Sequence, residues 1–111
     1  MKGNVLVVDD EQIVLRSCER LLIPEGYGVQ TASSAKEAIG LLANNSYDLI
    51  ITDLKMPEMN GLEFMKHVRT KDPDINIVVI TGYPSQESIK ESLDLRIIDY
   101  LPKPFSPALL L

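Results

Sequence analysis

The chain lacks several features that would each indicate a particular class of protein. It contains one cysteine, which excludes an intrachain disulfide and fits a reducing compartment. No apolar run approaches the roughly 20 residues that a membrane-spanning helix needs. An apolar run begins within a few residues of Met1, which leaves no room for a signal peptide. These absences predict a cytoplasmic protein.

The charge balance excludes one kind of partner for the domain itself. The 111 residues carry a net charge of −5 at pH 7, so the domain has no sequence-independent attraction for nucleic acid or anionic lipid. We therefore expect it to make no direct contact with DNA or a membrane. The length and an ordinary hydrophobic content of 45% predict one globular domain, over residues 1–111, with a single core.

Polar residues that can take part in chemistry stand at the ends of four apolar runs. Asp9 and Asp10 follow residues 5–8, Asp53 follows 49–52, Thr81 follows 77–80, and Lys103 follows 97–102. Such runs are typical of strands that are buried on both faces of a parallel sheet. Because open parallel sheets bind ligands at the carboxyl ends of their strands, we expect these five residues to converge there.

Helix signals alternate with the strands. The expected elements are a helix through residues 14–22, a less apolar strand at 27–32 near a sheet edge, and helices over 34–44, 60–70 and 85–95. Ser34 with Glu37 predicts a capping box for the second of these helices, and Asn60 with Glu63 predicts a cap for the third. Repeated strand–helix units with right-handed crossovers predict a three-layer α/β sandwich. A fifth helix begins at Ser106-Pro107 and stops at Leu111, so we expect the chain to be cut from something longer.

The five strand-end residues suit a divalent cation and a phosphoryl group. Mg²⁺ prefers hard oxygen ligands, which the three aspartates supply. A carboxylate can form an aspartyl phosphate when a metal and a cation neutralise the phosphoryl oxygens, so Asp53 is the candidate nucleophile and Lys103 the candidate cation. Each residue also has a simpler explanation: a helix cap for Asp9-Asp10, a surface lysine for Lys103 and an ordinary strand residue for Thr81.

The chain resembles the receiver domains of two-component response regulators, and the resemblance covers the residues from Val5 to Phe105. The matching motifs are VLVVDDE, DLIITDLKMPEMNGLE, VVITGY and DYLPKPF. The resemblance implies a flavodoxin-like, doubly wound five-stranded parallel sheet of order 2-1-3-4-5, with helices on both faces and a truncated fifth helix. It also implies a switch that is an enzyme only in catalysing its own phosphorylation and dephosphorylation.

The resemblance implies a role for each residue around the phosphoryl group. Asp53 is the phosphorylation site. Asp10, Asp53 and the backbone carbonyl of Lys55 hold Mg²⁺, with Mn²⁺ as an alternative ion, and Asp9 acts on the metal mainly through water. Lys103 pairs with one phosphoryl oxygen.

Further roles concern the response to phosphorylation. By the same resemblance, Thr81 binds a second phosphoryl oxygen and Tyr100 turns inward behind it. Lys55 and Tyr83 tune how fast water removes the phosphoryl group. The peptide bond before Pro104 is expected to be cis.

Partners also follow from the resemblance. They are a sensor histidine kinase or phosphotransfer protein and an output domain or effector protein. A homodimer through the face of the fourth helix, fifth strand and fifth helix is a further option. One departure bears on that face: Arg96-Ile97 stand where family members usually carry a small Gly-Ala pair.

Three other functions are alternatives to the switch. A haloacid-dehalogenase-like phosphohydrolase would carry an aspartate where this chain has Lys55. A mononucleotide-binding domain would have a Gly-rich loop after the first strand, and none is present. A degenerate receiver, acting as a scaffold without phosphate, is the remaining alternative. Neither His67, expected in a helix away from the strand ends, nor Cys18, expected in the core, is assigned to the site.

Overall fold

A five-stranded parallel sheet forms the centre of the molecule. The computed structural model describes residues 3–54, 56, 59–81, 90, 95 and 97–102. The strands are β1 (Gly3–Val8), β2 (Tyr27–Ala32), β3 (Leu49–Thr52), β4 (Asn76–Thr81) and β5 (Asp99–Pro102). Their order is β2-β1-β3-β4-β5, which confirms the predicted topology and the edge position of β2.

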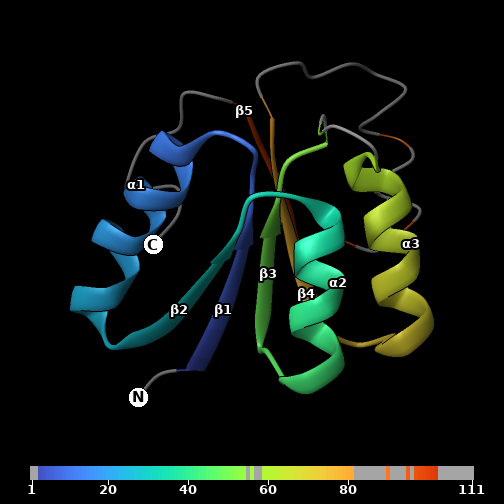
Figure 1. The fold of residues 1–111 in the computed structure, drawn as a ribbon, viewed down its shortest axis with the longest axis horizontal. Helices are drawn as coiled ribbons and strands as arrows, with labels where there is room; N and C mark the ends of the chain where they lie inside the picture. The colour runs from blue at the N-terminus through green and yellow to red at the C-terminus, as the bar shows by residue number, and fades with distance from the viewer. Residues whose placement is uncertain are drawn as a thin grey trace.

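Helices cover both faces of the sheet. Helix α1 (Gln12–Leu22), followed by a short 3₁₀ turn (Ile23–Glu25), packs on one face, while α2 (Ala35–Asn44) and α3 (Gly61–Lys71) pack on the other (Figure 1). The three-layer prediction is therefore confirmed. The predicted fourth helix, apart from Lys90 and Leu95, and the predicted fifth helix fall outside the described residues.

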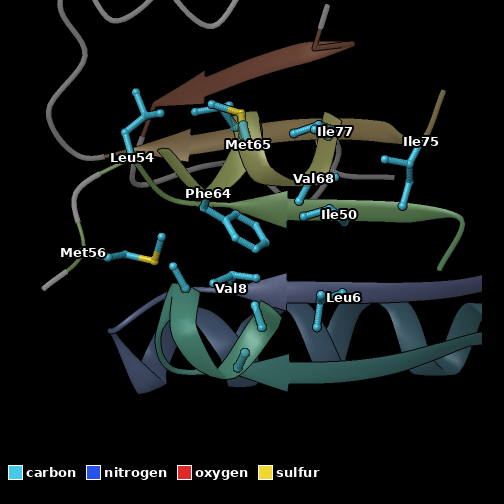
Figure 2. Close-up of a cluster of buried hydrophobic side chains, with 14 residues drawn as sticks. Leu6, Val8, Ile50, Leu54, Met56, Phe64, Met65, Val68, Ile75 and Ile77 are labelled. Carbon is cyan, nitrogen blue, oxygen red and sulfur yellow. The ribbon is translucent and has the colours of Figure 1, made fainter. Parts of the chain in front are cut away.

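The strands are apolar at successive positions because both sides of the sheet are buried. In β1, Leu6 and Val8 face α2 and α3, whereas Val5 and Val7 face α1, and all four side chains are buried. Figure 2 shows the α2–α3 side of the core, where Phe64 of α3 lies over the sheet. A strand in this position has no solvent-facing side on which a polar residue could stand. Polar side chains that could take part in a reaction therefore lie at the ends of the strands.

The caps of two helices agree with the sequence. The Ser34 hydroxyl accepts a hydrogen bond from the backbone N–H of Glu37 at 3.1 Å, and the Asn60 side chain accepts one from Glu63 N–H at 2.9 Å. The Glu37 carboxylate differs from the expected box, because it accepts from the hydroxyl of Ser33 at 3.0 Å. Both caps start their helices at the carboxyl edge of the sheet.

One arginine holds the opposite, amino edge of the sheet together. The Arg69 guanidinium of α3 donates from Nε to the Leu95 carbonyl at 2.8 Å, and from Nη1 to the carbonyls of Ile75 at 2.5 Å and Pro73 at 3.3 Å. Leu95 and Ile97 also pack against the core cluster on this side. The chain that enters β5 is therefore fixed beside α3. Arg96, the first residue of the departure from the family pattern, is outside the described residues.

Replacing Arg69 with alanine is expected to lower the free energy of unfolding by about 2–3 kcal/mol, because two partly buried carbonyls and one exposed carbonyl lose a charged donor. Urea denaturation measures the change. Lys66→Ala is the control, since Lys66 lies exposed on the same helix and its loss should cost less than about 0.5 kcal/mol. Equal stability of the two variants would contradict the role of Arg69.

Candidate functional site

Two buried aspartates lie side by side at the carboxyl edge of the sheet. Asp9 follows β1 and Asp53 follows β3, and these strands are neighbours whose last paired residues are Val8 and Thr52. The Asp53 N–H continues this ladder by donating to the Val8 carbonyl at 3.1 Å. Asp9 is 1% exposed and Asp53 4% exposed, so both carboxylates are largely removed from solvent.

The acidic side chains gather into a group with the spacing of a metal site. One carboxylate oxygen from each of Asp9, Asp10, Glu11 and Asp53 lies within 4.8 Å of the others. Asp10 and Glu11 are exposed at the rim. Four carboxylates this close repel one another, and a divalent cation among them would remove that repulsion. Their hard oxygens fit Mg²⁺ or Mn²⁺.

Backbone N–H groups orient the two buried carboxylates. Oδ1 of Asp9 accepts from Glu11 N–H at 2.9 Å, and Oδ1 of Asp53 accepts from Leu54 N–H at 2.7 Å. Glu11 is the N-cap residue of α1 and its own side chain makes no capping bond. The hydrogen bond of Asp9 is made with the N-cap residue and not with the first turn of α1, so it is not a helix cap. It does not compete with metal binding, because a carboxylate has two oxygens with several acceptor sites.

Glu11 is the acidic residue that the sequence analysis missed. It lies one residue beyond the aspartate pair and just before α1, so it was not counted among the residues at the strand ends. Its signal was the third acidic letter of VLVVDDE. Through its position at the rim, Glu11 adds to the negative charge that faces an approaching cation.

The remaining predicted residues are placed in part. Thr81 is buried and ends β4, the strand next to β3, so it lies at the same edge as Asp53. Tyr100 pairs with Val79 in the β4–β5 ladder. The predictions for Lys55, Tyr83, Lys103 and Pro104 fall on residues outside the described part of the chain.

Helix α3 begins in direct contact with the backbone of the candidate nucleophile. Gly61 N–H donates to the Leu54 carbonyl at 2.8 Å. A Cβ on Gly61 would lie 2.0 Å from the Asp53 carbonyl oxygen and 2.7 Å from Leu54 Cα. No side chain fits in that space, so a glycine is required for this close approach.

The sequence matches the family model described as the response regulator receiver domain over residues 5–111. The chain belongs to this family. Among curated relatives, it is 40% identical over 106 residues to response regulator MprA of Mycobacterium sp. (strain KMS), which covers 96% of this chain and 46% of the relative. It is 38% identical over 106 residues to the alginate biosynthesis transcriptional regulatory protein AlgB of Pseudomonas aeruginosa, covering 96% of this chain and 24% of the relative.

Solved receiver structures have the same fold. Chemotaxis protein CheY4 of Vibrio cholerae superposes with a TM-score of 0.92 at 33% identity, over 99% of this chain and 93% of that chain. Membership in the receiver family, together with the shared fold, decides against the phosphohydrolase and mononucleotide-binding alternatives. The chain spans about a quarter to a half of the length of the curated relatives given above.

Residues not assigned to the receiver site lie where the sequence placed them. Cys18 is buried in the core cluster beneath α1. His67 lies half-buried in the second half of α3, away from the Gly61 end that meets Asp53. Among the described helices, none has the length and apolar character needed to cross a membrane.

Gly61→Ala is expected to lower the free energy of unfolding by about 2–3 kcal/mol, because the new methyl group collides with backbone that cannot rotate away. Thermal and urea unfolding measure the loss.

The matched control is Gly40→Ala in α2, where an added Cβ meets nothing within 4 Å. That substitution should raise stability by about 0.5–1 kcal/mol, since alanine favours the helix. The same sign of change at both glycines would contradict the close packing of α3 on Asp53.

Proposed function

We propose that this receiver domain is a phosphoacceptor switch whose nucleophile is Asp53. The observation that carries the proposal is the group of four carboxylates within 4.8 Å, two of them buried at neighbouring strand ends, in a chain of the receiver family. The phosphoryl donor is the phosphohistidine of a sensor histidine kinase or phosphotransfer protein. A degenerate receiver, acting only as a scaffold, has no structural observation in its favour.

The reaction transfers one phosphoryl group. A carboxylate oxygen of Asp53 attacks phosphorus, the phosphorus–nitrogen bond of phosphohistidine breaks, and the imidazole leaves. Asp10, Asp53 and the Lys55 carbonyl would hold Mg²⁺, with Asp9 acting through water. The bound ion supplies neutralisation of the charge on the phosphoryl oxygens. Mn²⁺ would serve in the same way.

Two further side chains complete the proposed site. Lys103 follows the residue paired with Thr81 in the β4–β5 ladder and pairs with one phosphoryl oxygen. Thr81 donates its hydroxyl to a second oxygen after phosphorylation, and Tyr100 then moves inward behind it. These contacts form only in the phosphorylated protein. They therefore stabilise the conformation with Thr81 and Tyr100 turned inward relative to the unphosphorylated conformation.

Incubation with acetyl phosphate and Mg²⁺ should add one phosphoryl group to the intact protein, detected by mass spectrometry. Removal of Mg²⁺ with a chelator should abolish the gain, because the carboxylates then repel the donor. Asp53→Asn, which has the same shape without a nucleophilic charge, should gain nothing. A folded wild-type protein that gains no phosphoryl group would favour the scaffold alternative, and gain by Asp53→Asn would assign the nucleophile elsewhere.

Lys55 and Tyr83 are proposed to shield the acyl phosphate from water. Each alanine variant should lose the phosphoryl group several-fold faster, because the smaller side chain leaves the acyl phosphate more accessible to water. The measurement follows loss of label from purified phosphorylated protein. Ser17→Ala in α1 serves as a control, because the Ser17 hydroxyl donates to the Ile13 carbonyl one turn earlier in the same helix. Unchanged lifetimes in both alanine variants would contradict shielding.

The switch is proposed to act within a longer cytoplasmic regulator. The named relatives are about two to four times as long as this chain, and AlgB is by its name a transcriptional regulatory protein. Output would come from a further domain or an effector, while this acidic domain itself contacts neither nucleic acid nor membrane. A homodimer through the fourth helix, fifth strand and fifth helix remains a prediction.

A further inference from the structure

A buried hydroxyl is hydrogen-bonded to the backbone of the candidate nucleophile. Thr52 is the only polar residue of β3, its exposed fraction is 0%, and it lies on the same sheet face as Ile50. Its Oγ1 donates to the carbonyl of the next residue, Asp53, at 3.0 Å. The paired residues of β3 end at Thr52, so this carbonyl lies beyond the regular ladder.

The Asp53 carbonyl is confined from a second direction. Gly61 at the start of α3 approaches so closely that a Cβ there would meet the carbonyl oxygen at 2.0 Å and its carbon at 2.9 Å. The Thr52 hydroxyl and the Gly61 backbone therefore both restrict the same peptide group. Rotation of that group about the Asp53 backbone would break the hydrogen bond or cause a collision.

The same peptide group orients the Asp53 carboxylate. A peptide unit is planar, so the carbonyl of Asp53 and the N–H of Leu54 turn together. That N–H donates to Oδ1 of Asp53 at 2.7 Å. A hydrogen bond on the carbonyl side of this plane thus determines the direction of the hydrogen bond on the carboxylate side.

We infer that Thr52 is a positioning residue for phosphoryl transfer, acting through the Asp53–Leu54 peptide plane. Its hydroxyl holds the carboxylate in the orientation needed for attack, although it touches neither the metal nor the phosphoryl group. The inference rests on the proposed function of Asp53 as nucleophile. Small errors in orientation matter in such a step, since a misplacement of 1 Å can cost on the order of 100-fold in rate.

Two substitutions separate the hydroxyl from the shape of the side chain. Thr52→Val keeps the branched shape and removes the donor, whereas Thr52→Ser keeps the donor and removes a methyl group. The phosphorylation rate with acetyl phosphate and Mg²⁺ should fall on the order of tenfold in Thr52→Val, with an unchanged half-saturating acetyl phosphate concentration. Thr52→Ser should stay within about twofold of wild type, whereas a mere packing defect would slow it as well.

Thr70→Val is the matched control. The Thr70 hydroxyl also donates to a backbone carbonyl at 3.0 Å, that of Lys66, but it is exposed on α3 away from the site. This variant should react at the wild-type rate. If Thr52→Val does not fold, Thr52→Cys replaces it, since a thiol of similar size is a weak donor.

The outcomes distinguish the inference from the function on which it rests. Wild-type rates in folded Thr52→Val, or in Thr52→Cys, would overturn the positioning role while leaving Asp53 as the nucleophile. Equal slowing of Thr52→Ser and Thr52→Val would also overturn it. A wild-type protein that accepts no phosphoryl group would overturn both the proposed function and this inference.

Discussion

The pairing of β1 with β3 is the interaction on which the rest of the site depends. Because Val8 pairs with Thr52, the residues that follow them, Asp9 and Asp53, leave the sheet next to each other. A slip of one residue would exchange the faces of every side chain in the strand, and both faces are buried against different helices. The packing that selects the register therefore also places two aspartates 44 residues apart in the sequence within one acidic group.

Such a site opposes folding while it favours ligand binding. Two acidic side chains are nearly inaccessible to solvent and lie within 4.8 Å of two more, so lost hydration and mutual repulsion both raise the free energy of the folded protein. Backbone N–H groups offset part of this cost by donating to Asp9 and Asp53. The remaining negative potential is what a divalent cation, and then a phosphoryl group, would neutralise. The core on both sides of the sheet supplies the stability that holds this arrangement.

Sequence patterns predicted the elements whose determinants are local. The buried strands, the edge position of β2 and the caps at Ser34 and Asn60 follow from periodicity and from hydrogen bonds three residues apart. Strand order came from the resemblance to receiver domains rather than from the strands themselves. The convergence of Asp9, Asp10 and Asp53 followed from the rule that parallel sheets bind ligands at one edge, and it is confirmed.

Hydrogen bonds from side chains to backbone carbonyls, and close backbone contacts, were not predictable in this way. The guanidinium of Arg69 donates to the carbonyl of Leu95, 26 residues away, which only tertiary packing brings near α3. Thr52 is the last residue of an apolar run, and nothing in the neighbouring sequence shows that its hydroxyl turns toward the next carbonyl. Gly61 matched a family motif, but the reason for glycine is visible only as its distance to the Asp53 backbone.

The central claim is that residues from four strand ends form one phosphoryl site. A crystal structure with Mg²⁺ and beryllofluoride, a phosphoryl analogue, tests it most directly. The account predicts beryllium on an Asp53 oxygen, the metal on Asp10, Asp53 and the Lys55 carbonyl, and fluorides within hydrogen-bond distance of Thr81 and Lys103. Binding of the analogue at another residue, or a bound analogue that neither Thr81 nor Lys103 approaches, would contradict it.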